Sequence, residues 1–183
     1  SRHVVSEGSG LQIVAAPLQR HPLTPSRPDA IPRRLSDTSA MDAPSTALRR
    51  PLADLETPAL LLDTPRLQAN LLRMAQRMAA LGVRLRPHVK THKTAEIIAM
   101  QLKLGITKFK ASTIAEAEMC AAVGATDVLL AMPCVGINAH RLAELALKFP
   151  DTQFSSIADD MDTVRFLASA AQQHNVTLGV YLE

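Results

Sequence analysis

The side chains with the greatest capacity for chemistry lie in one run, Arg86-Pro87-His88-Val89-Lys90-Thr91-His92-Lys93. The run stands where a predicted strand, Arg84–Lys90, passes into a loop, and α/β sheets and barrels place active sites at such strand ends. Lys90 follows the apolar Val89, so we expect burial to destabilise its ammonium form and favour the amine. An amine of this kind forms Schiff bases with carbonyl compounds.

Two other interpretations of this run involve no Schiff base. A loop with two lysines and two histidines is typical of a solvated basic turn, and short motifs often match by accident. His88 and His92 are four residues apart, which is the spacing of a metal-binding pair on a helix. Pro87 and the strand-like flank argue against a helix, and no third ligand is evident, so no metal site is predicted in this chain. Thr91 and His92 are expected to hydrogen-bond or stack around a bound ring.

The elements that position this run alternate between strand and helix. Apolar runs predict strands at Ala59–Leu62, Arg84–Lys90, Ile106–Lys110, Asp127–Met132, Thr152–Ile157 and Val176–Leu182. Helical periodicity fills the gaps: Thr64 is the expected N-cap of the first helix, and Thr113 with Glu116 forms a capping box for a later one. Such alternation predicts an α/β fold with a parallel sheet built from right-handed βαβ units.

The strands from residue 84 onward number about five, whereas a complete (β/α)8 TIM-like barrel needs about 250 residues. We therefore predict a partial barrel and treat residues 51–183 as the truncated N-terminal part of a larger domain. For the fragment alone we expect no activity.

Residues 1–50 have a different composition. Prolines recur among Ser, Thr and Arg without a sustained period, which predicts a disordered leader. Its arginines outnumber its acidic residues and account for the whole formal net charge of +3. A targeting peptide and a regulatory tail are both compatible with this composition. We favour a third interpretation, upstream sequence translated with the gene, because Met41 begins the stretch that leads into the first ordered segment.

Composition excludes several classes of partner. Residues 51–183 carry balanced charge, and aromatic residues are only 3% of the chain, so no nucleic-acid-binding face is predicted. No apolar run reaches the roughly 20 residues that cross a bilayer. The cysteines, Cys120 and Cys134, have neither CxxC nor metal-knuckle spacing, which favours a reduced, cytoplasmic protein. Cys134 follows a strand, but no base is identified for it, so a small buried thiol is expected.

The run at Lys90 strongly resembles the R-P-H-x-K-T-H-K segment of the D-threonine aldolase and D-serine dehydratase family. These are alanine-racemase-like pyridoxal phosphate enzymes of fold type III. Thr57-Pro58-Ala59-Leu60-Leu61-Leu62-Asp63 resembles the family's T-P-x-L-x-x-D entry, and Glu116-Ala117-Glu118 with Gly124 resembles its E-A-E…G helix. Val180-Tyr181-Leu182-Glu183 resembles the start of its V-x-x-E-I-D-V-G strand.

The resemblance implies that Lys90 carries pyridoxal 5′-phosphate as an internal aldimine, with Lys93 as the alternative. It implies that His88, Thr91 and His92 lie around the cofactor. It also implies a divalent metal in the intact enzyme, bound by residues outside this chain, and a homodimer at full length.

The implied activity is that of a lyase on D-3-hydroxy amino acids. D-threonine aldolase ranks ahead of D-serine dehydratase, and an amino-acid racemase third. A non-catalytic pyridoxal phosphate-binding protein is the alternative from another class.

Overall fold

A parallel sheet forms the centre of the structure. The computed structural model describes residues 11–14, 54, 57–58 and 61–182. Neighbouring strands are all parallel and follow the order β1-β5-β4-β3-β2. The strands are β1 (Leu11–Val14), β2 (Lys108–Ala111), β3 (Asp127–Pro133), β4 (Gln153–Ala158) and β5 (Leu178–Leu182). The parallel α/β architecture predicted from the sequence is confirmed.

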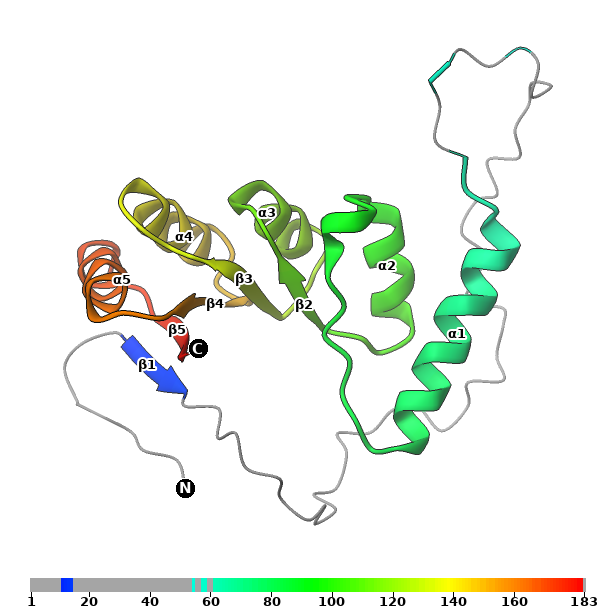
Figure 1. Cartoon of the computed structure of the whole chain (residues 1–183), viewed down its shortest axis with the longest axis horizontal. Coiled ribbons are helices and arrows are strands. Elements are labelled where there is room, and N and C mark those ends of the chain that lie inside the picture. The colour runs from blue at the N-terminus through cyan, green and yellow to red at the C-terminus, as the bar shows by residue number, and fades with distance from the viewer. Residues whose placement is uncertain (1–10, 15–53, 55–56, 59–60, 183) are drawn as a thin grey trace.

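Helices cover one face of this sheet. In Figure 1, α3, α4 and α5 run side by side along it, while α1 extends away from the sheet. The helices are α1 (Thr64–Ala80), α2 (Ala95–Lys103), α3 (Ile114–Ala122), α4 (Ile137–Lys148) and α5 (Met161–His174), with a short 3-10 turn, η3 (Val89–Thr91). Each of the helices α3 to α5 links consecutive strands, as a βαβ unit requires.

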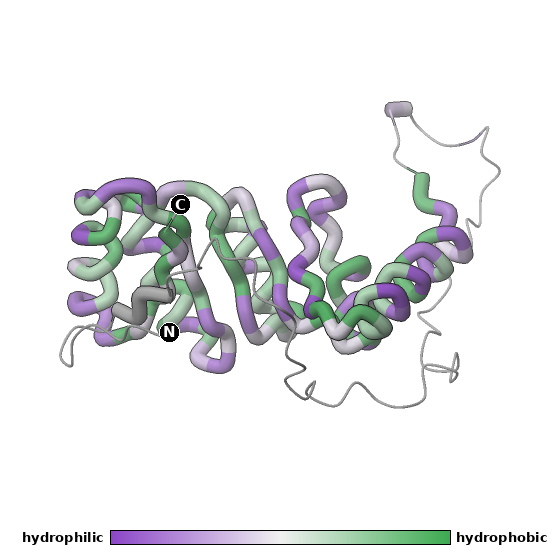
Figure 2. The backbone as a smooth tube through the Cα atoms, turned by 60° about the horizontal axis from the view of Figure 1, so that its bottom comes forward, coloured by the Kyte–Doolittle hydropathy of each residue, from purple (hydrophilic) through white to green (hydrophobic). Residues whose placement is uncertain are grey.

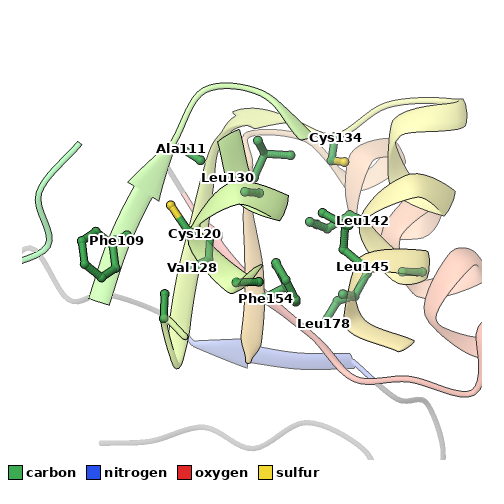
Figure 3. Close-up of a cluster of buried hydrophobic side chains, with 14 of the residues drawn as sticks. Phe109, Ala111, Cys120, Val128, Leu130, Cys134, Leu142, Leu145, Phe154 and Leu178 are labelled. Atoms are coloured by element: carbon green, nitrogen blue, oxygen red, sulfur yellow. The ribbon is translucent and has the colours of Figure 1, made fainter. Parts of the chain in front are cut away.

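The hydrophobic core lies between the sheet and these helices. Alternate residues of the strands point toward the helices, and Phe109, Phe154 and Leu178 are fully buried there. Figure 3 shows them packed with Cys120 of α3 and Leu142 of α4. Because side chains alternate across a strand, the intervening residues face the other side of the sheet. That second face carries the polar groups of the candidate site.

Helix α1 begins one residue earlier than predicted. Its N-cap is Asp63 and not Thr64, since Asp63 Oδ1 accepts a hydrogen bond from the Arg66 N–H at 3.0 Å. The negative charge of an aspartate at this position is also stabilised by the positive end of the helix dipole, whereas a neutral threonine hydroxyl gains no such stabilisation. Figure 2 shows both hydrophilic and hydrophobic residues along α1, as expected of an amphipathic helix.

Of the two hydrogen bonds of the predicted capping box on α3, the one accepted by Thr113 is confirmed. Thr113 Oγ1 accepts from the Glu116 N–H at 3.1 Å. The Glu116 carboxylate bonds to the N–H of Ser112 at 2.7 Å, one residue before the expected partner. This shift places a buried carboxylate directly behind the segment that contains Lys90.

Two predicted strands differ from the structure. Arg84–Lys90 forms one bridge, His88 to Lys110, in place of a continuous ladder. Pro87 has no N–H to donate, and the chain turns into η3 immediately after His88. In the predicted strand Ala59–Leu62, residues 61 and 62 adopt no regular structure, and residues 59 and 60 lie outside the described residues.

The predicted disordered leader is also interrupted. Residues 11–14 form β1, which pairs in parallel with β5 from Leu11 opposite Leu178 to Val14 opposite Tyr181. The open backbone edge of β5 explains this pairing, because an edge strand presents unpaired N–H and C=O groups to any apolar segment nearby. Other residues of 1–50, including Met41, lie outside the described residues. Within the described part of the chain, no helix is long and apolar enough to cross a membrane.

Candidate functional site

The sheet face opposite the helices, here called the inner face, carries the candidate site. Strand register arranges its side chains in rows. One row runs from Lys108 to Asp127, and the next runs from Lys110 through Leu129 and Ser155 to Gly179. His88 extends the second row, since it bridges to Lys110. Polar groups distant in sequence therefore meet on one surface.

His88 organises the turn that holds Lys90. It is the N-cap of η3, and its Nδ1 accepts from the Lys90 N–H at 3.3 Å. The hydrogen of the neutral ring is therefore on Nε2, which lies 3.2 Å from Ser112 Oγ. Burial lowers the pKa of His88, and the ammonium groups of Lys90 and Lys110 lower it further. At neutral pH, His88 is therefore uncharged, and it connects the η3 turn to β2.

Lys90 itself is exposed, which corrects the burial expected from the sequence. Only its neighbour Val89 is fully buried. The 3-10 turn causes this difference, since it rotates consecutive side chains away from strict strand alternation. Among the described residues, the Lys90 side chain has no hydrogen-bond or ion-pair partner.

Lys93 is engaged elsewhere. Its Nζ forms an ion pair with Glu116 Oε1, and its backbone has φ of 46°. Glu116 is 4% exposed and also accepts from the Ser112 N–H. Burial alone would raise the pKa of Glu116, but the bonds from Lys93 and Ser112 outweigh it and lower the pKa. Of the two candidate lysines, Lys93 is committed to a buried carboxylate and Lys90 is not.

Thr91 and His92 occupy different environments. Thr91 is exposed. His92 is half-buried, and its Nδ1 accepts from the Thr94 N–H at 3.1 Å. Its Nε2 is buried without a partner among the described residues, and burial lowers the His92 pKa. A buried N–H without an acceptor is a donor available to a bound group.

A second cluster fixes the segment before Lys90. Arg86 binds Asp127 through two hydrogen bonds, of 2.6 and 2.9 Å, and Lys108 Nζ reaches the same carboxylate at 2.6 Å. The Tyr181 hydroxyl lies 3.2 Å from Arg86. Burial would raise the Asp127 pKa, but these cationic donors outweigh it and hold the pKa low. The cluster joins the Lys90 segment to β2, β3 and β5.

Other reactive groups contribute little. Cys134 is fully buried, as predicted, and burial raises the pKa of its thiol to about 11. Such a thiol is a poor nucleophile at neutral pH. Within residues 61–182, no three potential metal ligands come together.

Residues 62–183 match the family described as alanine racemase, N-terminal domain. The matched range contains the Lys90 turn and strands β2 to β5. The chain belongs to this family. Family membership confirms the resemblance drawn from the sequence to fold type III pyridoxal phosphate enzymes, with their TIM-like barrel.

Relatives within the alanine racemase N-terminal domain family include lyases. The D-threo-3-hydroxyaspartate dehydratase of Delftia sp. (strain HT23) is 38% identical over 117 residues, 63% of this chain and 30% of the relative. The 3-hydroxy-D-aspartate aldolase of Paracoccus denitrificans (strain Pd 1222) is 32% identical over 120 residues, with the same coverage. The crystal structure of D-threonine aldolase from Filomicrobium marinum superposes with a TM-score of 0.66 at 36% identity, covering 72% of this chain and 35% of that one. The chain thus spans about a third of the length of these relatives.

Sequence reasoning missed three residues that the structure places around the Lys90 segment. Glu116 was assigned only to helix capping and to the E-A-E resemblance, and neither Asp127 nor Lys110 was assigned any role. One signal was available in the sequence. Lys108 and Lys110 flank the apolar Phe109, so both lysines lie on the face of β2 opposite to Phe109. Asp127 begins the next strand and so faces the same row as Lys108.

The Glu116 contacts lead to a prediction about the Lys90 loop. Glu116→Gln should lower the free energy of unfolding by about 1–2 kcal/mol, since it removes one charge-assisted bond whose lysine is largely exposed. Amide hydrogen exchange should accelerate at residues 89–93. Glu118→Gln is the matched control on the same helix, because Glu118 pairs with Lys148 at the surface. Equal effects of the two variants in urea unfolding and hydrogen exchange would contradict the anchoring role.

Proposed function

We propose that the full-length protein is a pyridoxal 5′-phosphate-dependent lyase that acts on D-3-hydroxy amino acids, with Lys90 as the residue that binds the cofactor. The reaction we favour is retro-aldol cleavage of D-threonine to glycine and acetaldehyde. The observation that carries the proposal is the contrast between two lysines: Lys93 is ion-paired to buried Glu116, whereas the Lys90 amine has no partner in the part of the chain that the structure describes.

The residues around Lys90 fit the cofactor. Lys90 offers an accessible primary amine, which the cofactor aldehyde requires. His92 offers a buried N–H that lacks an acceptor among the described residues. Lys110 adds positive charge beside the turn, and neutral His88 adds hydrogen-bonding capacity. These groups suit a planar anionic aldehyde better than a neutral apolar ligand.

Each residue of the turn has a separate task in this proposal. Pyridoxal phosphate supplies an electron sink for negative charge at the substrate Cα. Lys90 would hold the cofactor through its side-chain amine, next to the position where the substrate amine binds. His88 fixes the Lys90 backbone through Nδ1 and stays neutral, so it adds no charge to repel the Lys90 ammonium. Glu116 holds Lys93 in an ion pair, which leaves Lys90 as the lysine of this loop that is available to the cofactor.

Dehydration is the second candidate reaction. It is favoured by the relative that dehydrates a D-3-hydroxy amino acid and shares 38% identity over the matched region. In that reaction the α-proton leaves and hydroxide departs from Cβ, so D-serine would yield pyruvate and ammonia. D-serine dehydratase, amino-acid racemase and a non-catalytic cofactor-binding protein remain the alternatives to the aldolase.

Incubating the holoenzyme with D-threonine and with D-serine separates these functions. We expect glycine and acetaldehyde from D-threonine, measured by amino-acid analysis and by coupled reduction of the aldehyde. Pyruvate and ammonia from D-serine would instead identify a dehydratase, and the L-enantiomers alone would identify a racemase. Bound cofactor with no product from either substrate would contradict an enzyme of this kind and favour a binding protein.

The proposal extends to the whole protein's setting. It includes a divalent metal, held by residues that this chain does not supply, and a homodimer in the cytoplasm. The absence of disulfides among the described residues supports a reducing compartment, since both cysteines there are unbridged and buried. Loss of activity on chelation, restored by added metal, would support the metal.

A further inference from the structure

The inner face of the sheet carries more positive than negative charge. Among the described residues, its cationic side chains are Arg86 in the Lys90 segment and Lys108 and Lys110 on β2. The carboxylate on this face is Asp127, and Arg86 and Lys108 both bind it. Glu116, the nearest carboxylate on α3, is engaged by Lys93 and Ser112. Among the described residues, neither carboxylate therefore forms a pair with Lys110.

Lys110 is a half-buried lysine in this surrounding. Its backbone is fixed, because its N–H donates to the Pro87 carbonyl at 2.9 Å and its residue bridges to His88. Its side chain has no hydrogen-bond or ion-pair partner among the described residues. A partly buried ammonium without a counter-charge is unfavourable, because it loses water and gains nothing in return. Lys108, two residues earlier on the same face, avoids this cost through Asp127.

The row that contains Lys110 offers it no counter-charge. Across the sheet this row continues with Leu129, Ser155 and Gly179, none of which carries a charge. The side toward Lys90 is formed by His88, whose ring is neutral and points to Ser112. An incoming anion would thus meet Lys110 as the nearest unengaged cation on the row just before the Lys90 turn.

We propose that Lys110 is an oxyanion-binding residue of the Lys90 site. Its ligand is a carboxylate of the amino-acid substrate or an acidic oxygen of the cofactor, and both offer an ammonium group the same chemistry. The inference rests on the proposed function, because it assumes that Lys90 binds the cofactor. The inference adds a residue of β2 to the Lys90 site, and it requires that the group bound there be negatively charged.

The test compares variants of the holoenzyme in two binding measurements. Lys110→Met removes the charge at similar length, Lys110→Gln is a second uncharged variant in case the first misfolds, and Lys110→Arg keeps the charge. Lys103→Met is the matched control, since Lys103 is exposed at the end of α2. The first measurement is the dissociation constant of pyridoxal 5′-phosphate by absorbance. The second is calorimetric binding of D-aspartate and D-alanine at saturating cofactor.

The uncharged variants should weaken one of these equilibria about 10- to 100-fold, the loss of a charge-assisted bond, while the Arg and Lys103 variants stay close to wild type. Weaker D-aspartate binding alone would identify a side-chain carboxylate, as in a 3-hydroxyaspartate. Equal losses for both amino acids would identify the α-carboxylate, and weaker cofactor binding would identify a cofactor oxygen. All three support the proposal.

Unchanged binding in both measurements would overturn the oxyanion role of Lys110. Failure of the proposed function is distinguishable from this result. A wild-type holoenzyme that binds these ligands but cleaves no D-3-hydroxy amino acid contradicts the lyase, and the binding comparison still decides the role of Lys110. Wild-type protein that binds neither cofactor nor amino acid refutes both.

Discussion

Replacing Lys90 by alanine should remove the visible absorbance of the lysine-bound cofactor and prevent its trapping by borohydride. The reason is the chemistry of the bond: reduction fixes the cofactor only where an amine has condensed with its aldehyde. Turnover of D-threonine should fall about 10²- to 10⁴-fold, the usual loss when a side chain positioned at the reacting atoms is removed. Absorbance spectra and mass spectrometry of reduced peptides measure both effects.

Lys93→Ala is the matched control for this experiment, because Lys93 lies three residues later in the same loop and is committed to Glu116. The Lys93 variant should keep the absorbance band and the trapped peptide, with a modest loss of stability from the unpaired Glu116. If Lys93→Ala abolished trapping while Lys90→Ala preserved it, the assignment of Lys90 would be wrong.

Replacing Asp127 by alanine should lower the free energy of unfolding by about 3 kcal/mol. The substitution leaves Arg86 and Lys108 mostly buried without their shared counter-charge, and breaking such a pair from one side is costly. Asp127→Asn should cost less, since the amide still accepts a hydrogen bond. Asp162→Ala is the surface control, because its partner Arg165 is exposed, and it should change the free energy by less than about 0.5 kcal/mol.

The Asp127 effect should depend on pH in a defined direction. The pKa of Asp127 is lowered in the folded protein. Its stabilising contribution is therefore complete above the unfolded pKa of about 3.9, and it is lost as the pH falls through the folded value. Urea unfolding should show a difference in the free energy of unfolding between wild type and Asp127→Asn at pH 7 that shrinks below about pH 4. A constant difference over this range would contradict the charge-based role.

The framework of the fold followed from local patterns. Apolar runs located β2 to β5 to within a few residues, and the capping signal at Thr113 located the start of α3. These features depend on neighbours in sequence, so a single sequence contains the information for them. The placement of Lys90 after a strand-like segment rested on the same kind of pattern.

The side-chain network of the site did not follow from such patterns. Arg86 and Asp127 are 41 residues apart, and their contact depends on the register between parallel strands. The ion pair between Lys93 and Glu116 depends on how α3 packs behind the loop. Lys90 is exposed because it lies in a 3-10 turn, whereas the strand-like sequence of Arg84–Lys90 predicted a strand there. Tertiary packing decided each of these features.

The backbone around Lys90 has one further consequence. The segment before η3 shares a single bridge with β2, whereas β2 to β5 are joined by continuous ladders. Charged side chains supply further contacts of this segment, and the Lys93–Glu116 pair, whose lysine is largely exposed, is the one that added salt weakens most, because buried pairs are screened less. Rising ionic strength should therefore increase the mobility of the segment that contains Lys90 before it affects the rest of the sheet. Buffer composition then becomes a means of changing the site without a substitution.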